Sequence, residues 1–338
     1  MASEPVTGGG GVPREPAVVL DPVIQRLVDA SAAPPYLHQL GPVDGRQALL
    51  ETQGHLLDDC GVTTEYHVAP VGPAGLTGFW VFRPAGVSAA LPVVVYVHGG
   101  RWMLGDARTH ARMIGELSAT SEAAFVVPEY TRTPEARYPV AVEESYAVLT
   151  WVAEHAADLA LDGRRMAVAG DCAGATMATA LTMMAKRRGG PRLRAQLLYY
   201  PMTDPGCDTD SQRRFASGYL LTRAAMEWYW EQYTDDEHEL DEPTAAPLRA
   251  SDEDLKGLPP ALVISAEADV VRDEGEQYAR RLLRAGVPVT CVRYLGTVHD
   301  FASLNPLRDS PPTSAAVRQG GRFLRDALAP RPSRQSTY

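Results

Sequence analysis

The 338-residue chain is predicted to be an α/β protein, an eight-stranded, mostly parallel sheet with helices on both faces and a helical cap. Short apolar runs alternate with segments of helical periodicity, which is typical of a doubly wound sheet. One run, PVVVYVH at 92–98, is continuously apolar, as expected of a strand covered on both faces. The stretch 204–253 interrupts the alternation, and we expect it to form part of the cap.

Each strand is predicted from a short apolar or alternating run. The runs at 62–69 and 77–82 alternate like a hairpin and are expected to supply the antiparallel edge. The other predicted strands lie at 92–98, 124–128, 166–170, 195–200, 261–266 and 289–294. Apolar residues at helical spacing predict helices at 22–30, 46–54, 139–156, 174–187, 222–233 and 273–285.

The chain divides into six segments. Glycine- and proline-rich composition predicts that both ends of the chain are flexible tails. The predicted segments are a tail at 1–20, cap helices at 21–55, core at 56–203, cap insertion at 204–253, core at 254–328 and a tail at 329–338. The insertion contains the aromatic helix 222–233. We expect this helix either to cover the strand ends as a lid or only to pack onto the core.

Composition narrows the class of function. The net charge of −10 argues against nucleic acid or an anionic membrane as the main partner. The chain contains no run long and apolar enough to predict a membrane span, and its first residues do not resemble a secretory signal, so a cytoplasmic protein is expected. Its four cysteines form neither a disulfide framework nor a C-x-x-C zinc pair, and we expect no metal or cofactor.

The strongest local motif is Gly170-Asp171-Cys172-Ala173-Gly174, which follows a predicted strand and opens a predicted helix. It matches the G-x-S-x-G nucleophile elbow with cysteine in the serine position. The glycines allow a sharp turn that exposes the nucleophile at a helix N-terminus, where negative charge is favoured. Cys172 is therefore the candidate nucleophile.

A second motif, His98-Gly99-Gly100, directly follows the apolar strand. A glycine loop at this place can bring backbone amides close to a developing oxyanion. The predicted oxyanion donors are the amides of Gly99, Gly100 and Ala173. His98 itself is expected to pin its loop, and His110 is expected at the surface.

Five segments together resemble the hormone-sensitive-lipase-like (bacterial esterase) branch of the α/β-hydrolases. They are HGGRWMLGD (98–106), YTRTPEARYPVAVEE (130–144), YPMTDP (200–205), ISAEADVVRDEGEQYARRL (264–282) and YLGTVHDF (294–301). The resemblance implies an α/β-hydrolase fold with Asp269 as the acid and His299 as the base. Asp273 and Glu274 are alternative acids, although both are better explained as the start of a helix.

The chain departs from the family pattern at three informative positions. Cys172 replaces serine, so the acyl intermediate would be a thioester, which favours acyl transfer, thioester chemistry or cyclisation. A weak esterase, an inactive relative and an engineered trapping variant are the alternatives. Arg101 replaces a third glycine and would either clamp a carboxylate or phosphate or point to solvent. Asp300 follows the histidine and would raise the pKa of His299 if the two approached.

The leading hypothesis is an enzyme that acts on an ester or thioester through an acyl-cysteine, by hydrolysis or acyl transfer. The expected partner is a small-molecule acyl substrate, free or attached to a carrier or coenzyme A, and the expected assembly is a monomer or homodimer. Candidate substrate-binding residues are Arg101, Trp102, Tyr219 and Trp228. The alternatives are a non-covalent cyclase or lyase and a ligand-binding protein with a retired site. Cys60, Cys207 and Cys291 are expected to be inert, with Cys291 in a strand core.

Overall fold

A computed structural model describes residues 17–54, 61–87 and 89–330. The sheet has eight strands in the order β1-β2-β4-β3-β5-β6-β7-β8. Strand β2 pairs antiparallel with both β1 and β4, and every other pair is parallel, so the antiparallel strands form one edge as predicted. The strands are β1 Val62–Ala69, β2 Thr77–Pro84, β3 Leu91–Val97, β4 Ala124–Pro128, β5 Leu161–Asp171, β6 Leu193–Tyr199, β7 Ala261–Ala268 and β8 Val289–Val298.

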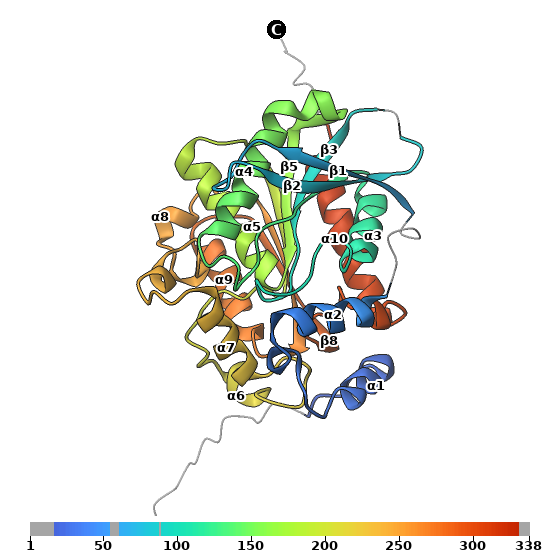
Figure 1. Ribbon diagram of the computed structural model, residues 1–338, viewed down its shortest axis with the longest axis vertical. Helices are drawn as coiled ribbons and strands as arrows, with labels where there is room; N and C mark the ends of the chain where they lie inside the picture. The colour runs from blue at the N-terminus through green and yellow to red at the C-terminus, as the bar shows by residue number, and fades with distance from the viewer. Residues whose placement is uncertain (1–16, 55–60, 88, 331–338) are drawn as a thin grey trace, which may run out of the picture.

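Helices cover both faces of the sheet (Figure 1). Helices α3 and α10 pack against each other on one face, and α4 and α5 are neighbours on the other, where α9 also packs against the sheet. The α-helices are α1 Pro22–Ala30, α2 Gly41–Gln53, α3 Ala111–Ser121, α4 Val140–His155, α5 Ala173–Arg188, α6 Asp210–Arg214, α7 Arg223–Tyr233, α8 Asp252–Leu255, α9 Arg272–Arg284 and α10 Pro311–Leu328. This is the predicted α/β-hydrolase fold.

The core lies in the central strands and in the helix that follows β5. Every residue of β3 is buried, because this strand has neighbours on both sides and helices on both faces. Helix α5 is buried from Ala173 to Ala185 and consists largely of alanine, threonine and methionine. Small side chains let this helix approach the sheet closely, which fixes the turn that precedes it.

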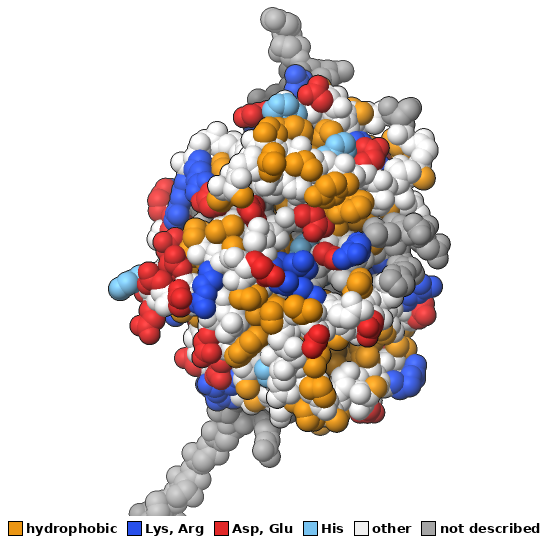
Figure 2. Space-filling view, in the orientation of Figure 1, with side chains coloured by type: hydrophobic (Ala, Val, Ile, Leu, Met, Phe, Trp, Pro, Cys, Tyr) orange, Lys and Arg blue, Asp and Glu red, His pale blue; other side chains and the backbone are white. Residues whose placement is uncertain are grey.

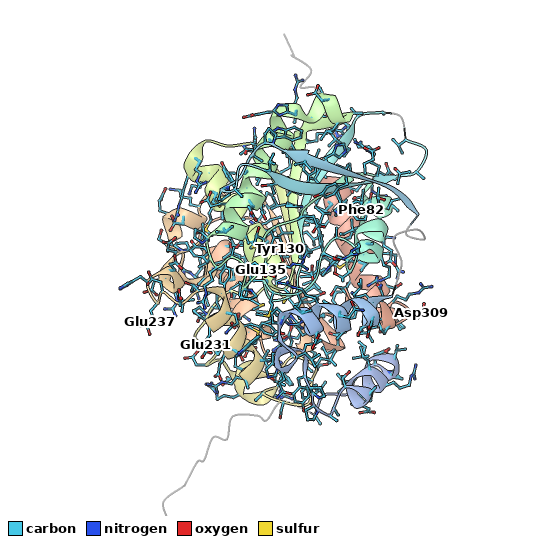
Figure 3. All side chains as sticks on the ribbon, viewed as in Figure 1. Phe82, Tyr130, Glu135, Glu231, Glu237 and Asp309 are labelled. Atoms are coloured by element: carbon cyan, nitrogen blue, oxygen red, sulfur yellow. The ribbon has the colours of Figure 1, made fainter. Side chains whose placement is uncertain are left out.

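The cap consists of two parts of the chain that are far apart in sequence. Helices α1 and α2 lie beside α6 and α7 beyond one end of the sheet (Figure 1). Arg46 of α2 holds this cap to the core, because its guanidinium donates to both carboxylate oxygens of Glu135, at 2.6 and 2.7 Å, and to the carbonyls of Met103 and Thr133. Glu135 lies close to α2 in Figure 3.

The ends of the described chain refine the predicted tails. Leu20 is buried and Val18 packs against the core, and the amide of Asp21 donates to the carbonyl of Gly296 at 2.9 Å, so the chain is held to the core from Val18 on. The remainder of the first tail, most of the last one and Cys60 lie outside the described residues.

The surface is mixed in character. On the face shown in Figure 2, acidic and basic side chains lie interspersed among apolar ones. None of the described helices has the length and apolar character needed to cross a membrane.

Candidate active site

Cys172 lies at a sharp turn between β5 and α5. Its φ of 54° and ψ of −126° form a left-handed conformation that is strained for any residue with a side chain. The flanking glycines make the turn possible, because a Cβ at Gly170 would overlap the carbonyl of Gly174, and a Cβ at Gly174 would overlap that of Val97. The turn therefore places Cys172 at the N-terminus of α5, as the motif predicts.

Three candidate catalytic side chains lie in a chain of contacts. His299 follows β8, and its Nε2 is 3.1 Å from Cys172 Sγ. Asp269 follows β7, and its Oδ2 is 2.8 Å from His299 Nδ1. On its other side the sulfur contacts Met202 Sδ at 3.2 Å. The geometry gives the thiol an adjacent base and gives that base an orienting carboxylate.

Charge around His299 favours its protonated form. Burial alone would lower the pKa of His299, but the carboxylates of Asp269 and Asp300 outweigh burial and raise the pKa well above its ordinary value. Asp300 Oδ1 is 3.3 Å from His299 Nε2, the same nitrogen that faces the sulfur. The predicted approach of Asp300 to the histidine is thus present.

The two alternative acids lie elsewhere. Asp273 Oδ2 accepts from the amide of Ser211 at 2.8 Å, at the start of α6. Glu274 is buried and accepts from the amide of Thr203 at 2.7 Å. Both residues tie the cap insertion to α9, and neither contacts His299.

The loop after β3 supplies fewer free amides than the sequence predicts. The amide of Gly99 already donates to Asp171 Oδ1 at 2.9 Å, so this predicted oxyanion donor is engaged inside the protein. For the amides of Gly100 and Ala173, the described residues provide no hydrogen-bond acceptor. Of the three predicted donors, these two remain available to an oxyanion.

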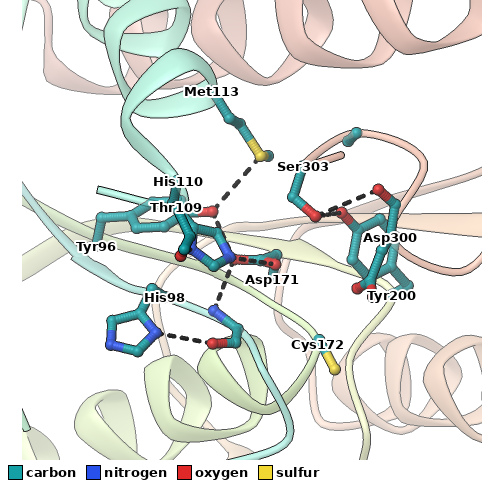
Figure 4. A network of polar contacts seen from close by, with 12 residues as sticks. Tyr96, His98, Thr109, His110, Met113, Asp171, Cys172, Tyr200, Asp300 and Ser303 are labelled. Carbon is teal, nitrogen blue, oxygen red and sulfur yellow. Dashed lines mark hydrogen bonds and ion pairs between the residues drawn. The ribbon is translucent and has the colours of Figure 1, made fainter. Parts of the chain in front are cut away.

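Asp171, next to the cysteine, anchors the loop that carries those amides (Figure 4). It accepts from Tyr96 Oη at 2.6 Å and lies 3.3 Å from His110 Nε2. Burial opposes both charges, yet the pairing wins, since the pKa of Asp171 is lowered and that of His110 is raised. The prediction of a surface position for His110 is therefore wrong: its side chain is 4% exposed and lies against the elbow.

Arg101 is buried rather than solvent-directed. Its side chain is 8% exposed, and its Nη2 donates to Asp300 Oδ2 at 2.5 Å. The guanidinium also lies over the ring of Tyr229, 5.8 Å from the ring centre. Because Asp300 contacts His299 as well, Arg101 joins the network around the thiol.

A cavity of about 310 Å³ lies between the cap and this network. Its walls come from the N-terminal helices and from α7 and the segment before it, so the insertion does more than pack onto the core. Arg101, Asp300 and Tyr229 line the cavity, whereas Cys172 and His299 do not and have no exposed surface. These three lining residues therefore separate the cavity from the thiol.

The other predicted substrate-binding residues do not line this cavity. Trp102 is fully buried, with its ring centre 4.6 Å from that of Trp230 and 4.0 Å from that of Tyr233. Tyr219 and Trp228 are half-buried on the cap. Nothing in the sequence distinguishes a tryptophan that lines a pocket from one that joins two segments.

The cysteines and possible metal ligands complete the site. Cys172 Sγ and donor atoms of His299 and Asp300 lie within 4.8 Å of one another, the one such group found in the described parts of the chain. Cys207 is a buried free thiol, and burial raises its pKa to about 12. Cys291 is exposed on β8, so its predicted place in a strand core is wrong.

The comparisons with known proteins agree with this architecture. Residues 94–303 match a family model described as an alpha/beta hydrolase fold. A thermostable esterase from Pseudomonas putida ECU1011 superposes with a TM-score of 0.89 at 42% identity, over 95% of this chain and 100% of that one.

Two relatives of known sequence extend the comparison. The carboxylesterase NlhH of Mycobacterium tuberculosis is 35% identical over 329 residues, 93% of this chain and 99% of its own length. Putative alpha/beta hydrolase R526 of Acanthamoeba polyphaga mimivirus is 36% identical over 298 residues, 88% of this chain and 85% of its own. The chain therefore belongs to the α/β-hydrolase family, in its hormone-sensitive-lipase-like branch.

Proposed function

We propose that the protein cleaves carboxylic esters or thioesters through a covalent acyl-cysteine on Cys172. The observation that carries this proposal is the 3.1 Å contact between the sulfur and His299 Nε2, combined with the 2.8 Å contact between His299 Nδ1 and Asp269. The names of the esterase relatives support the ester as the substrate class.

The first half-reaction forms a thioester and releases the alcohol or thiol. Because the nearby carboxylates favour protonated His299, the proton of the Cys172 thiol rests on His299 Nε2, and the thiolate sulfur attacks the carbonyl carbon. The amides of Gly100 and Ala173 hold the oxygen that becomes negative. As the bond to the leaving group breaks, His299 returns the proton to the departing oxygen or sulfur.

The second half-reaction transfers the acyl group. Water, or an acceptor alcohol, amine or thiol, gives its proton to His299 and attacks the thioester carbonyl. The bond from the carbonyl carbon to sulfur breaks, and Cys172 recovers the proton. Asp269 holds the imidazole tautomer and supports its positive charge throughout.

Intact mass spectrometry with 4-nitrophenyl acetate tests this proposal. The protein is expected to gain one acetyl group on Cys172, and Cys172→Ala is expected to gain none and to lose turnover. Addition of N-acetylcysteamine then measures partition between hydrolysis and transfer. Turnover that survives in Cys172→Ala but is lost in His299→Ala would support a non-covalent catalyst instead, and ligand binding without turnover would support a retired site.

A further inference from the structure

The cavity is bounded on one side by the charged side chains of Arg101 and Asp300. Of the described residues that line it, Arg101 and His38 are basic and Asp300 is acidic, while most of the others are leucine, alanine and proline. Burial and the nearby Arg101 both lower the pKa of His38, so this imidazole is neutral at neutral pH. Arg101 is therefore the cation that a molecule in the cavity would meet.

The guanidinium of Arg101 is only partly satisfied. Its Nε–H and one Nη2 N–H point along the same edge, a fork that matches the two oxygens of a carboxylate. Asp300 Oδ2 occupies Nη2 alone at 2.5 Å, and Nε is buried with no hydrogen-bond partner among the described residues. A buried donor without a partner is unfavourable, so this edge would gain from an acceptor that reaches both donors.

The reason for the incomplete pairing is that Asp300 has two partners. Its second oxygen, Oδ1, faces His299 Nε2 at 3.3 Å instead of Arg101 Nε. A carboxylate that is not held by His299 could accept from both donors of the Arg101 edge at once. Such a carboxylate would satisfy Nε and leave Asp300 paired with the imidazole.

We infer that Arg101 binds a free carboxylate on the acyl part of the substrate, in exchange for Asp300. The preferred substrates are thus mono-esters or mono-thioesters of dicarboxylic acids. This inference rests on the proposed acyl-cysteine chemistry and names its substrate class. The size of the cavity, about 310 Å³, suits a short diacid, and the pairing with Asp300 shows that this guanidinium takes a carboxylate as its partner.

The test compares two matched series of substrates. One series is the mono-4-nitrophenyl esters of succinic, glutaric and adipic acids, and the other is the corresponding esters whose free carboxylate is replaced by a neutral carboxamide. The readout is the ratio of kcat/KM for the charged ester to that for its amide at each chain length. A charge-assisted pair in a buried site predicts a ratio of about 10–100 for at least one length.

Three variants are expected to change the kcat/KM ratio in different ways. Arg101→Gln is expected to bring the ratio to about 1, because the charged donor edge is lost. Asp300→Asn is expected to raise the ratio, because the competing carboxylate is removed. Arg223→Gln, which breaks a surface pair with Glu227 on α7, is the matched control and is expected to keep the wild-type ratio. Circular dichroism of each variant verifies that it is folded.

The outcomes distinguish a failure of the carboxylate site at Arg101 from a failure of the proposed acyl-cysteine chemistry. If neutral esters acylate Cys172 but no chain length prefers the carboxylate, or if Arg101→Gln keeps the preference, the carboxylate site is refuted and the acyl-cysteine stands. If neither series leaves an acyl group on Cys172, the proposed chemistry itself fails. If the ratio rises in Asp300→Asn and collapses in Arg101→Gln, the exchange is supported.

Discussion

Replacing Asp171 by asparagine is expected to destabilise the protein in a pH-dependent way. The side chain is fully buried, accepts from Tyr96 and Gly99, and lies 3.3 Å from His110. Asparagine can keep both acceptor contacts through its carbonyl oxygen but loses the charge that faces His110. Loss of one buried charge-assisted contact predicts a decrease of about 1–3 kcal/mol in the free energy of unfolding.

The sign of the pH dependence follows from the two shifts. The folded-state pKa of His110 is raised, so its contribution is complete below the unfolded value near pH 6.5 and is lost as pH rises through the folded value. The folded-state pKa of Asp171 is lowered, so its contribution is complete above about pH 4 and is lost as pH falls through the folded value. The pair is therefore worth most between about pH 4 and pH 6.5.

Urea unfolding of the wild type and of Asp171→Asn measures this effect at about pH 5.5 and about pH 9. The difference between the two proteins is expected to be larger at the lower pH. His110→Gln is the control, and adding it to Asp171→Asn should cost little more than either change alone. Equal destabilisation at both pH values, or additive effects of the two substitutions, would refute the ion pair as the cause.

Three further predictions concern the elbow, the base and the cap. Gly174→Ala is expected to lower the free energy of unfolding by several kcal/mol, because its Cβ would lie 2.5 Å from the carbonyl oxygen of His98, and urea unfolding measures this loss. Gly206→Ala is the control and should be nearly neutral, because its Cβ would meet only the side chains of Asp204, at 3.2 Å, and Asp208, at 3.7 Å. Asp300→Asn removes a carboxylate that raises the pKa of His299, so His299 should lose its proton at a lower pH. In a profile of kcat/KM against pH, the decrease at alkaline pH should therefore move to lower pH. An alkaline decrease at the wild-type pH would contradict an effect of Asp300 on His299. Burial raises the pKa of Glu274 to about 8, so folding favours its protonated form and the free energy of unfolding falls between about pH 4.5 and pH 8. Glu274→Gln should reduce this decrease by about 1 kcal/mol or more, as measured by urea unfolding across that range. The same decrease in the variant would contradict the raised pKa of Glu274.

Much of the sheet follows from local pattern alone. The predicted bounds of 22–30, 62–69 and 124–128 coincide with α1, β1 and β4. Helices α3, α6, α8 and α10 were not predicted, and for α10 packing explains why. Helix α10 contains Gly320 and Gly321, which suggest a break in sequence, but a Cβ at Gly320 would overlap Tyr199 Oη and one at Gly321 would lie 2.5 Å from Thr120 Cβ. These glycines permit close approach between elements, which only the folded chain reveals.

The candidate site also contains residues that the sequence predicts and one that it does not. Cys172, His299 and Asp269 belong to motifs whose spacing and order are recognisable in sequence, and the structure places them in contact. His110 gives no such signal, because its partner Asp171 comes from a different strand end and meets it only when β3 and β5 pair. Long-range partners of this kind decide whether a polar side chain is buried, and composition around it does not.

Trp102 has a mechanical consequence for access to the thiol. The ring is stacked against Tyr233 and tilted against Trp230, both of α7. The adjacent residue in the chain, Arg101, lies over Tyr229 of the same helix. A close-packed aromatic contact resists gradual shear, so α7 cannot swing outward without unstacking this ring or pulling the arginine with it. Helix α7 and Arg101, which both line the cavity, therefore move together, and a molecule large enough to displace α7 also displaces Arg101.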